Sequence, residues 1–416
     1  MSLMKSWVTS ANSPDTDFPL NNLPYGVFST GADEARCGVA IGDQILDMAA
    51  LEAAGIVSLG TEAVFDLPFW NDVMELGADA WSALRNRLLQ LLASGAPEQS
   101  LVAPHLIAMT DAQLHMPVVV SEFTDFYASR HHATNVGTMF RGAQNALPPN
   151  WLHIPIGYNG RASTVVVSGT DIRRPMGQLM ELDAAMPSFG PCKRLDIELE
   201  IGAIVGTSTE MGTRINVAQA DAMIFGYVLL NDWSARDIQA WEYQPLGPFQ
   251  AKAFATSISP WIVTPAALAP FRTSTPAREH ELLPYLREDA PMLFDIDLAV
   301  DIQPQGGTAQ TIARTNYNEM YYSAAQQLTH HASSGCAMNA GDLLGSGTIS
   351  GPEKHQCGSL LELSWGGKEP MTLANGDTRS FVEDGDTMTL RGHAQGDGYR
   401  VGFGTCSGTV LPAIVT

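Results

Sequence analysis

Acidic and apolar residues alternate strictly over residues 195–201, which is the pattern of a β-strand. A strand there would place the leucine and isoleucine side chains on the core face and the carboxylates on the other. Glu198 and Glu200 would then lie about 7 Å apart, close enough to share a hard cation. A solvated sheet face would give the same pattern, and Asp295 and Asp297 repeat it. The spacing alone leaves both interpretations open, and we expect the second pair to bind nothing.

A further acid, Asp232, closes the apolar run at residues 224–230. Such a run predicts a buried strand, and ligands are commonly bound where strands end. Ser234 and Asp237 then resemble a capping box that opens a helix. An acid in this position can also be only a helix cap, so the position by itself does not make Asp232 a metal ligand.

Another group of polar residues begins at Asp125, just past the apolar run at residues 118–120, which predicts a buried strand, and here too the acid can be only a helix cap. His131 and His132 follow, and Arg141 lies nine residues beyond the second histidine. A histidine could take a proton from water, and an arginine could bind a carboxylate through two hydrogen bonds. In an extended segment the two imidazoles would point to opposite sides, so only one of them would face a substrate. Histidines without a chemical role would fit the same spacing.

Lys252 is a lone cation in the apolar, glycine- and proline-containing stretch at 247–254. A lysine held there would be oriented, although a buried stem with its amine reaching water explains the position nearly as well. The chain has no G-x-S-x-G, H-E-x-x-H or P-loop motif, and residues 345–351 miss the dinucleotide-binding pattern. Esterase, zinc protease, nucleoside triphosphatase and NAD enzyme are therefore disfavoured.

Two structural units must position these residues, and the first is small. Between residues 25 and 48, short apolar runs surround Gly42 and Asp43, a turn typical of antiparallel strands. Leucines at helical spacing predict an amphipathic helix over 80–94, which serves packing. We predict a β-rich N-terminal domain at residues 1–117.

The second unit is larger. Beyond Pro117 the chain is a series of apolar strands broken by glycine and proline, with a helical period near 319–333. We therefore predict a mainly β protein whose C-terminal domain, at residues 118–416, carries the chemistry.

Composition limits the class of protein. The chain of 416 residues is 45% hydrophobic, which provides a buried core for two or three structural units. Its net charge of −21 makes nucleic acids and anionic membranes poor partners. Five widely spaced cysteines form no C-x-x-C pair, and neither a signal peptide nor a membrane-spanning stretch is evident. We expect a protein of the reducing cytoplasm.

Five segments together resemble the fumarylacetoacetate hydrolase family, in order along the chain. They are TDFYASRHHATNVGTMFRG, NWLHIPIGYNGRASTVVVSGT, LDIELEIGAIVG, LNDWSARDIQAWEYQPLGPF and SPW. The resemblance implies an SH3-like N-terminal barrel, a larger mixed β-roll and a homodimer. It also implies hydrolysis of a carbon–carbon bond in 4-fumarylacetoacetate to give fumarate and acetoacetate, the last step of tyrosine and phenylalanine breakdown.

The family's functional residues can be placed on this sequence position by position. The metal ligands fall on Asp125, Glu198, Glu200 and Asp232. The general base falls on His132 and its carboxylate partner on Glu362. The oxyanion donors correspond to Arg141, Gln239 and Lys252. The substrate contacts correspond to Tyr127, Tyr158, Tyr243 and Thr348, together with Arg141 and Gln239. A second cation site would use Lys252 and Thr256, although Ala255 stands where the mammalian members have glycine.

Four carboxylates favour a hard cation, so Ca²⁺ or Mg²⁺ is expected rather than Zn²⁺. An acylpyruvate hydrolase or an oxo-acid decarboxylase of the same superfamily is the nearest alternative, although such relatives are typically shorter chains. A scaffold that binds a metal without catalysing a reaction is a third interpretation. An assay with fumarylacetoacetate separates the three.

Overall fold

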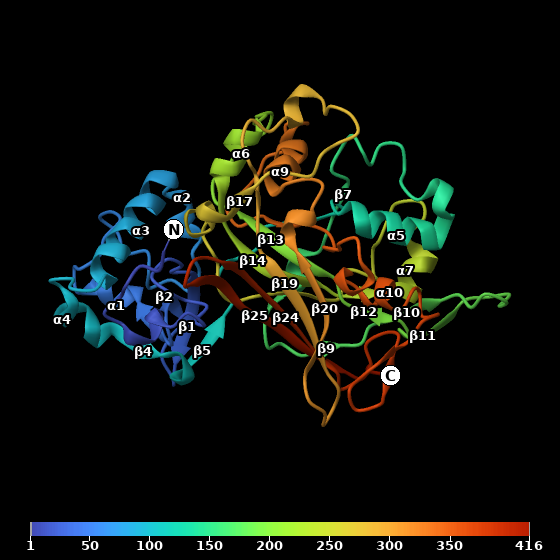
Figure 1. Ribbon diagram of the computed structural model, residues 1–416, viewed down its shortest axis with the longest axis horizontal. Helices are drawn as coiled ribbons and strands as arrows, with labels where there is room; N and C mark the ends of the chain where they lie inside the picture. The colour runs from blue at the N-terminus through green and yellow to red at the C-terminus, as the bar shows by residue number, and fades with distance from the viewer. Residues whose placement is uncertain (1, 416) are drawn as a thin grey trace.

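The N-terminal part is built around one antiparallel sheet with the strand order β4-β3-β2-β1-β5 (Figure 1). The computed structural model describes residues 2–415. The strands are β1 (Tyr25–Thr30), β2 (Arg36–Ile41), β3 (Gln44–Asp47), β4 (Leu106–Ala108) and β5 (Ala112–His115). The predicted turn at Gly42 and Asp43 joins β2 to β3, with Gly42 at a φ of 60°. This meander is the sheet expected of an SH3-like barrel.

Helices cover the N-terminal sheet and its connections. They are α1 (Met48–Ala53), α2 (Asn71–Glu75), α3 (Ala78–Leu92) and α4 (Gln99–Val102). The predicted helix at 80–94 is α3, and its leucines at positions 84, 88 and 91 are buried. This confirms that the helix is amphipathic and serves packing.

The larger part contains a mixed seven-stranded sheet with the order β7-β6-β21-β13-β14-β16-β8. Its strands are β6 (Phe123–Phe126), β7 (Gly157–Asn159), β8 (Val165–Val167), β13 (Leu199–Val205), β14 (Ile224–Asp232), β16 (Thr256–Ile258) and β21 (Leu343–Gly345). A five-stranded sheet, β20-β19-β24-β25-β9, packs against it. Its strands are β9 (Ile172–Arg173), β19 (Asp297–Gln303), β20 (Gln310–Asn316), β24 (Thr387–Gln395) and β25 (Arg400–Leu411).

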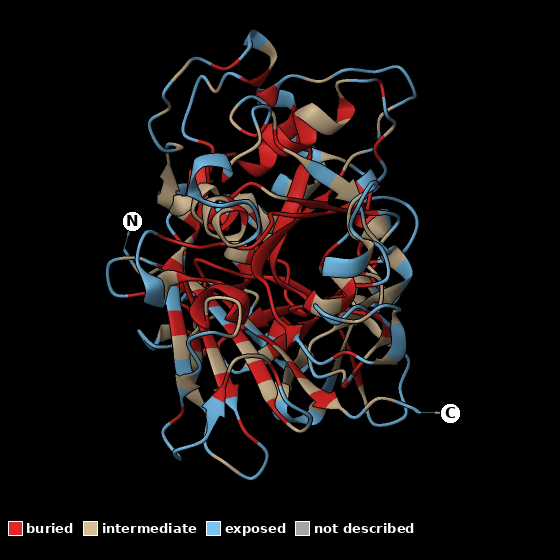
Figure 2. Ribbon diagram, turned by 90° about the vertical axis from the view of Figure 1, so that its right-hand side faces the viewer, coloured by how far each residue is buried: buried red, intermediate tan, exposed pale blue. Residues whose placement is uncertain are grey.

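Strand β14 is buried along its whole length because both of its faces are covered. Val228 and Leu230 pack into the hydrophobic cluster of the N-terminal part. Tyr227 and Leu229 pack into the main C-terminal core on the other face. This burial on both faces explains why the sequence of the strand is a nearly continuous apolar run. Figure 2 shows buried residues concentrated on these central strands.

Helices and two-stranded sheets complete the C-terminal part. The helices are α5 (Arg130–Arg141), α6 (Val217–Met223), α7 (Arg236–Glu242), α8 (Pro265–Leu268), α9 (Ala324–Ala332) and α10 (Leu360–Leu363). The paired strands are β10 (Met176–Leu179) with β11 (Ser188–Pro191), β12 (Leu195–Asp196) with β15 (Ser234–Ala235), β17 (Arg272–Thr273) with β18 (Leu293–Phe294), and β22 (Met371–Thr372) with β23 (Thr378–Arg379). The helical period near 319–333 is α9. Among residues 2–415, none of the helices is long and apolar enough to span a membrane.

Three local predictions were wrong. Residues 118–120 form no strand, and Asp125 lies within β6 rather than beyond a strand. The segment 195–201 is not continuous, because it breaks between β12 and β13. The proposed capping box is absent: Asp237 accepts hydrogen bonds from the backbone N–H of Lys193 and from the Cys192 thiol instead.

Candidate active site

Neighbouring strands of the seven-stranded sheet bring four acids together. Asp125 lies in β6, Glu200 in β13 and Asp232 at the end of β14, and Glu198 immediately precedes β13. Carboxylate oxygens of all four lie within 4.8 Å of one another, and all four residues are buried. The sheet thus creates an acidic cluster from residues that are up to 107 positions apart in the sequence.

Strand β21 runs between β6 and β13 and leaves space for this cluster. Gly345 pairs with Asp125, and a Cβ atom on Gly345 would lie 2.8 Å from Glu200 Oε2 and 2.9 Å from Asp125 Oδ1. Any side chain at this position would therefore displace the carboxylates. The glycine is the structural reason that two acids from strands on either side of β21 can meet.

The break between β12 and β13 places Glu198. Asp196 accepts hydrogen bonds from Arg236 and from the backbone N–H groups of Leu360 and Leu361, which holds it away from the cluster. The carbonyl of Glu198 accepts from the backbone N–H of Asp232. The acids at 196, 198 and 200 therefore do not share one face, because the middle of the segment is anchored to neighbouring elements.

Charge is only partly balanced within the cluster. Lys252 donates to Glu198 and to Asp232, the latter at 2.6 Å, and Thr256 donates to Asp232 at 3.0 Å. Burial acts to raise the pKa of Glu198, but Lys252 and Arg236 more than offset it and lower this pKa overall. Glu198 is therefore held ionised.

Asp125 and Glu200 lack such partners. Burial, followed by repulsion from neighbouring carboxylates, raises the pKa of both well above the ordinary range. Asp125 Oδ1 and Glu200 Oε1 are buried and have no hydrogen-bond partner. Unpartnered carboxylate oxygens that converge in this way fit a hard divalent cation, which would supply the missing positive charge. The donor set of this chain thus fits a metal.

Arg236, at the start of α7, belongs to the site although we did not predict it. Its side chain is buried, donates to Asp196 at 2.8 Å and forms an ion pair with Glu198 at 2.8 Å. It also donates to Gln239 at 3.2 Å. The signal available in the sequence was an arginine four residues after Asp232, close enough along the chain to pair with the acids of the cluster.

His132 and Glu362 form a buried pair beside the acids. His132 Nδ1 lies 2.7 Å from Glu362 Oε2. The expectation of an extended segment was wrong, because both histidines lie in the first turn of α5, which Ser129 caps. They still diverge, since successive side chains on a helix are about 100° apart. His131 instead lies near the surface, 3.5 Å from Glu319.

Glu362 is fixed by further donors. Asn135 donates to Oε1, and Ser350 and Ser359 donate to Oε2, at 2.8 to 2.9 Å. Burial acts to raise the pKa of Glu362, but His132 and these hydrogen bonds lower it overall. The carboxylate is therefore held both in place and in its ionised form.

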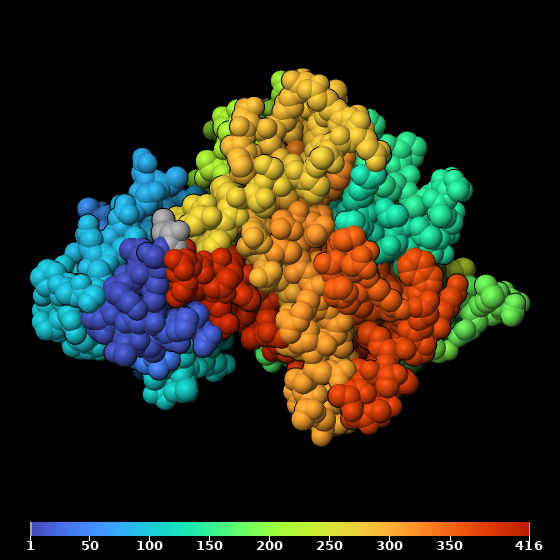
Figure 3. All heavy atoms as spheres, viewed as in Figure 1, coloured from blue at the N-terminus to red at the C-terminus, as the bar shows by residue number. Residues whose placement is uncertain are grey.

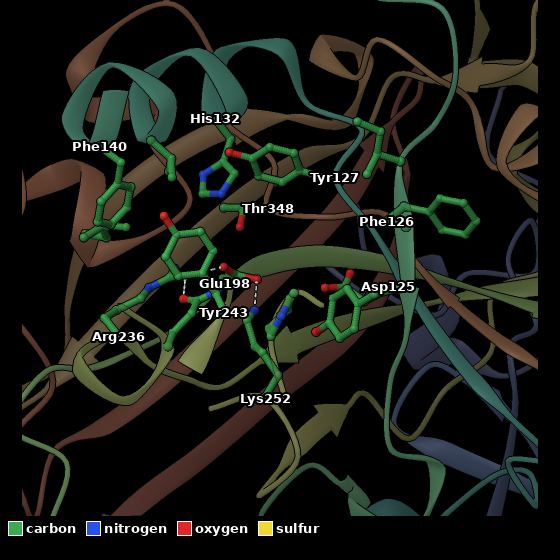
Figure 4. A pocket seen from close by; sticks show the side chains of 18 of the residues that line it. Asp125, Phe126, Tyr127, His132, Phe140, Glu198, Arg236, Tyr243, Lys252 and Thr348 are labelled. Carbon is green, nitrogen blue, oxygen red and sulfur yellow. Dashed lines mark hydrogen bonds and ion pairs between the residues drawn. The ribbon is translucent and has the colours of Figure 1, made fainter. Parts of the chain in front are cut away.

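One pocket of about 390 Å³ joins the acids to the histidine (Figure 4). In this view His132 lies above Glu198, Lys252 lies below it, and Asp125 lies to its right. The predicted residues that line the pocket are Asp125, Tyr127, His132, Arg141, Tyr158, Glu198, Gln239, Tyr243, Lys252 and Thr348. Glu200, Asp232, Thr256 and Glu362 lie behind the lining.

Several lining residues already have partners. Arg141 donates to the carbonyls of Asn145 and Ala146, so part of its guanidinium closes the end of α5. Tyr158 donates to Asp232 at 3.4 Å. Thr348 Oγ1 is buried and has no partner. The hydroxyl of Thr348 is thus available to a ligand.

The acids at positions 295 and 297, whose sequence pattern matches that of Glu198 and Glu200, lie outside the cluster. Asp295 and Asp297 share the amide of Asn316, and the side chain of Asp297 is exposed. Within residues 2–415, the cluster around Asp125 is the only group of three or more acidic, histidine or cysteine side chains that could hold a metal.

Known proteins resemble the chain over nearly its whole length. The fumarylacetoacetase N-terminal profile matches residues 21–117, and the fumarylacetoacetate hydrolase C-terminal profile matches residues 121–411. The chain is 52% identical to the fumarylacetoacetase of Bos taurus, over 96% of this chain and 97% of that protein. It is 51% identical to the Homo sapiens protein of the same name, over 96% and 98%.

Solved structures share the fold at low sequence identity. A fumarylacetoacetate hydrolase from Exiguobacterium antarcticum has a TM-score of 0.52 and 16% identity, over 94% of this chain and 99% of that chain. A maleylpyruvate hydrolase from Sphingobium has a TM-score of 0.51 and 16% identity, over 94% and 100%. The profiles and the curated relatives cover both parts of the chain, which therefore belongs to the fumarylacetoacetate hydrolase family.

Proposed function

We propose that this protein hydrolyses the carbon–carbon bond of 4-fumarylacetoacetate to give fumarate and acetoacetate, the last step of tyrosine and phenylalanine breakdown. The observation that carries the proposal is one pocket lined both by Asp125 and Glu198 of the four-acid cluster and by His132 of the buried histidine–carboxylate pair. Identity of about 50% to fumarylacetoacetases along nearly the whole chain supports the same reaction and substrate. The protein is thus a hydrolase that acts on carbon–carbon bonds.

Asp125, Glu198, Glu200 and Asp232 would hold the cation, and their oxygen donors favour Ca²⁺ or Mg²⁺. When bound, the cation supplies Lewis-acid polarisation of the diketone and stabilises the negative charge of the leaving group. Lys252 and Thr256, which both donate to Asp232, position this carboxylate, and the resemblance to the family would place a second cation beside them.

His132 would act as the general base. Its Nδ1 faces Glu362, so the proton resides on Nδ1 and Nε2 is free to accept one from water. The hydroxyl oxygen then adds to the substrate carbonyl, and the carbon–carbon bond next to that carbonyl breaks. The leaving carbon takes back the proton from Nε2. Glu362 holds the imidazole in this orientation and stabilises the imidazolium between the two proton transfers.

Cationic and polar side chains of the pocket would bind the dianionic substrate. Lys252, Gln239 and Arg141 would donate to the tetrahedral oxyanion and the carboxylates. Tyr127, Tyr158, Tyr243 and Thr348 would fix the carbon chain through their hydroxyl groups. Arg236 adds a further positive charge at the pocket wall. Together with the bound cation, these positive charges would let a chain of net charge −21 accept an anion.

The assembly would be a homodimer formed mainly by the C-terminal part. Sedimentation at micromolar concentration should show a single species of roughly twice the chain mass of 44.7 kDa, because a stable two-fold interface persists there. A species of the chain mass alone would contradict the dimer.

A spectrophotometric assay tests the reaction. Loss of the fumarylacetoacetate absorbance, with fumarate and acetoacetate formed in equal amounts, is expected with Ca²⁺ or Mg²⁺ present. An acylpyruvate of similar length serves as the competing substrate and should react more slowly. Faster turnover of the acylpyruvate would reassign the substrate, and a bound ion without any turnover would leave only a metal-binding scaffold.

A further inference from the structure

Strands β10 and β11 form an arm that projects from the body of the protein beside α7 (Figures 1 and 3). Among the described residues, each of the two strands pairs only with the other. The arm carries apolar side chains in solvent: Leu182 is 98% exposed, Met186 76% and Phe189 71%. An isolated two-stranded hairpin is marginally stable in water, and apolar side chains that remain in water do not stabilise it. The base of this arm packs on α7, because Leu179 and Ile238 lie in the same buried cluster, but the outer part that carries the three exposed side chains needs a further surface on which to pack.

The apolar surface continues from the arm to the mouth of the pocket. Trp241 of α7 donates to Gln178 in β10 at 3.0 Å, which ties the helix to the base of the arm. The loop after α7 exposes Phe249 and Leu246, the latter by 94%. Leu246 lines the pocket together with Phe140 of α5, which is 55% exposed. The arm, α7 and the pocket mouth therefore form one continuous surface.

The area of this surface is that of a subunit interface. Its large apolar side chains are Phe140, Met180, Leu182, Met186, Phe189, Trp241, Tyr243, Leu246 and Phe249. Together they leave roughly 1,000 Å² in solvent, whereas the largest apolar patch of a monomer is about 300 to 600 Å². Each partner in a stable protein complex buries about 800 Å². A small ligand cannot cover such a surface, but another protein subunit can.

A second copy of this chain fits the surface best. A two-fold interface uses the same patch on both subunits, so a projecting element and the surface that receives it must lie together on one chain, as they do here. Charge is complementary as well. Glu181 of the arm is paired with Lys193, which leaves Asp183 as the charge at the tip, and the pocket mouth exposes Arg141.

We propose that in the homodimer the arm of each protomer packs over the mouth of the partner's active-site pocket and completes it. The inference rests on the dimer and the pocket proposed above, and adds which surfaces meet and what the contact does. The arm covers the exposed side chains of Phe140 and Leu246, which excludes water from the outer end of the pocket. Exclusion of water strengthens the electrostatic interactions that hold the substrate.

The double variant Leu182→Asp with Met186→Asp tests the interface, and Leu283→Asp is the matched control because Leu283 is also an exposed leucine. The double variant should sediment as a monomer at concentrations where the unchanged protein is a dimer, and its KM should rise roughly tenfold or more. The control should change neither property. Circular dichroism of all three proteins checks that they fold. A dimeric double variant with unchanged KM would overturn the proposal.

A mixing experiment shows whether the arm acts on the partner's pocket. His132→Gln retains the arm but lacks the base, and the double arm variant retains the base but lacks the arm. A mixed dimer keeps one intact arm contact, so the mixing is done at a concentration at which sedimentation shows the mixed dimer. There the intact arm of the first protomer covers the intact site of the second, and mixing should restore substrate affinity. Activity that stays at the sum of the separate variants, with the mixed dimer present, would show that the arm serves its own chain.

Different experimental outcomes would overturn the proposal about the arm and the proposal about the reaction. An unchanged protein that is dimeric but inactive on fumarylacetoacetate would overturn the reaction alone, while loss of the dimer in the double variant would still support the interface. Full activity on fumarylacetoacetate from an unchanged protein that is monomeric would overturn the arm alone.

Discussion

The Nδ1 atom of His132 lies 2.7 Å from Glu362 Oε2, and both side chains are buried. The two residues are separated by 230 positions in the chain. Asn135, Ser350 and Ser359 occupy the remaining acceptor positions of the carboxylate. The pair therefore has one defined arrangement, with Nε2 of the imidazole left for a proton transfer.

Replacing His132 by Gln should lower turnover by roughly 10²-fold to 10⁴-fold, because the general base is lost. Metal affinity, measured by calorimetry, should remain close to that of the unchanged protein. His131→Gln is the control, since His131 contacts Glu319 near the surface and should matter little. Loss of activity in the control, with near-normal turnover in His132→Gln, would place the base elsewhere.

Glu362→Gln should also lower turnover, because glutamine does not stabilise the imidazolium as a carboxylate does. The double variant with His132→Gln should be little worse than His132→Gln alone, since residues that act as one unit are not additive. Rate constants for both single variants and the double variant complete the cycle. Losses that multiply would mean that Glu362 acts independently of His132.

Glu200→Gln should weaken metal binding while stabilising the metal-free protein, because burial and the charge of Asp125 raise the pKa of Glu200. Thermal unfolding with and without Ca²⁺ measures both effects. The unchanged protein should gain stability on saturation, by about 2.7 kcal/mol at a hundredfold excess over Kd. Asp297→Asn, a change at an exposed acid, should leave the Ca²⁺ response intact. A full Ca²⁺ response in Glu200→Gln would exclude Glu200 as a ligand.

Arg236→Met should destabilise the protein by about 3 to 5 kcal/mol, because it leaves Asp196 and Glu198 buried without this partner. Urea unfolding provides the free energy. Arg287→Met removes an ion pair between exposed side chains, Arg287 and Glu281, and should cost no more than about 1 kcal/mol. Equal losses in the two variants would contradict the structural role of Arg236.

Much of the fold follows from local sequence patterns. The turn at Gly42 and the helix α3 were predicted because their signals lie within a few residues. The break at Ile197 could not be predicted, because it depends on Asp196 binding Arg236 and the N–H groups of α10. Periodicity identifies a strand but not the tertiary contact that interrupts it.

The spacing of acidic residues along the sequence suggests an acidic cluster but does not predict which acids meet in it. Asp295 and Asp297 alternate with apolar residues just as Glu198 and Glu200 do, although only Glu198 and Glu200 lie in the cluster. The difference comes from β21, whose Gly345 leaves room for carboxylates. The resemblance to a family supplied the remaining residues, and their roles in the reaction stay predictions.

A prediction outside the site concerns Asp342, which is buried before β21. Burial raises its pKa to about 6, above the 3.8 of an exposed aspartate. The folded protein therefore binds the proton of Asp342 more tightly than the unfolded chain does. The free energy of unfolding that Asp342 contributes falls as the pH rises from about 4 to about 6. Asp342→Asn should raise the unfolding temperature at pH 7.5, and the gain should vanish toward pH 4. A pH-independent difference would contradict this assignment.

Metal-dependent cleavage of fumarylacetoacetate is the central claim, and one assay tests it most directly. The protein is treated with a chelator, dialysed, and assayed for fumarate and acetoacetate before and after Ca²⁺ or Mg²⁺ is added back. Activity should be lost on chelation and restored by the cation. The cation should not restore the activity of Asp125→Asn, because this variant lacks one of the four converging carboxylates. Full turnover in the chelated protein, or no turnover under any metal condition, would contradict the account.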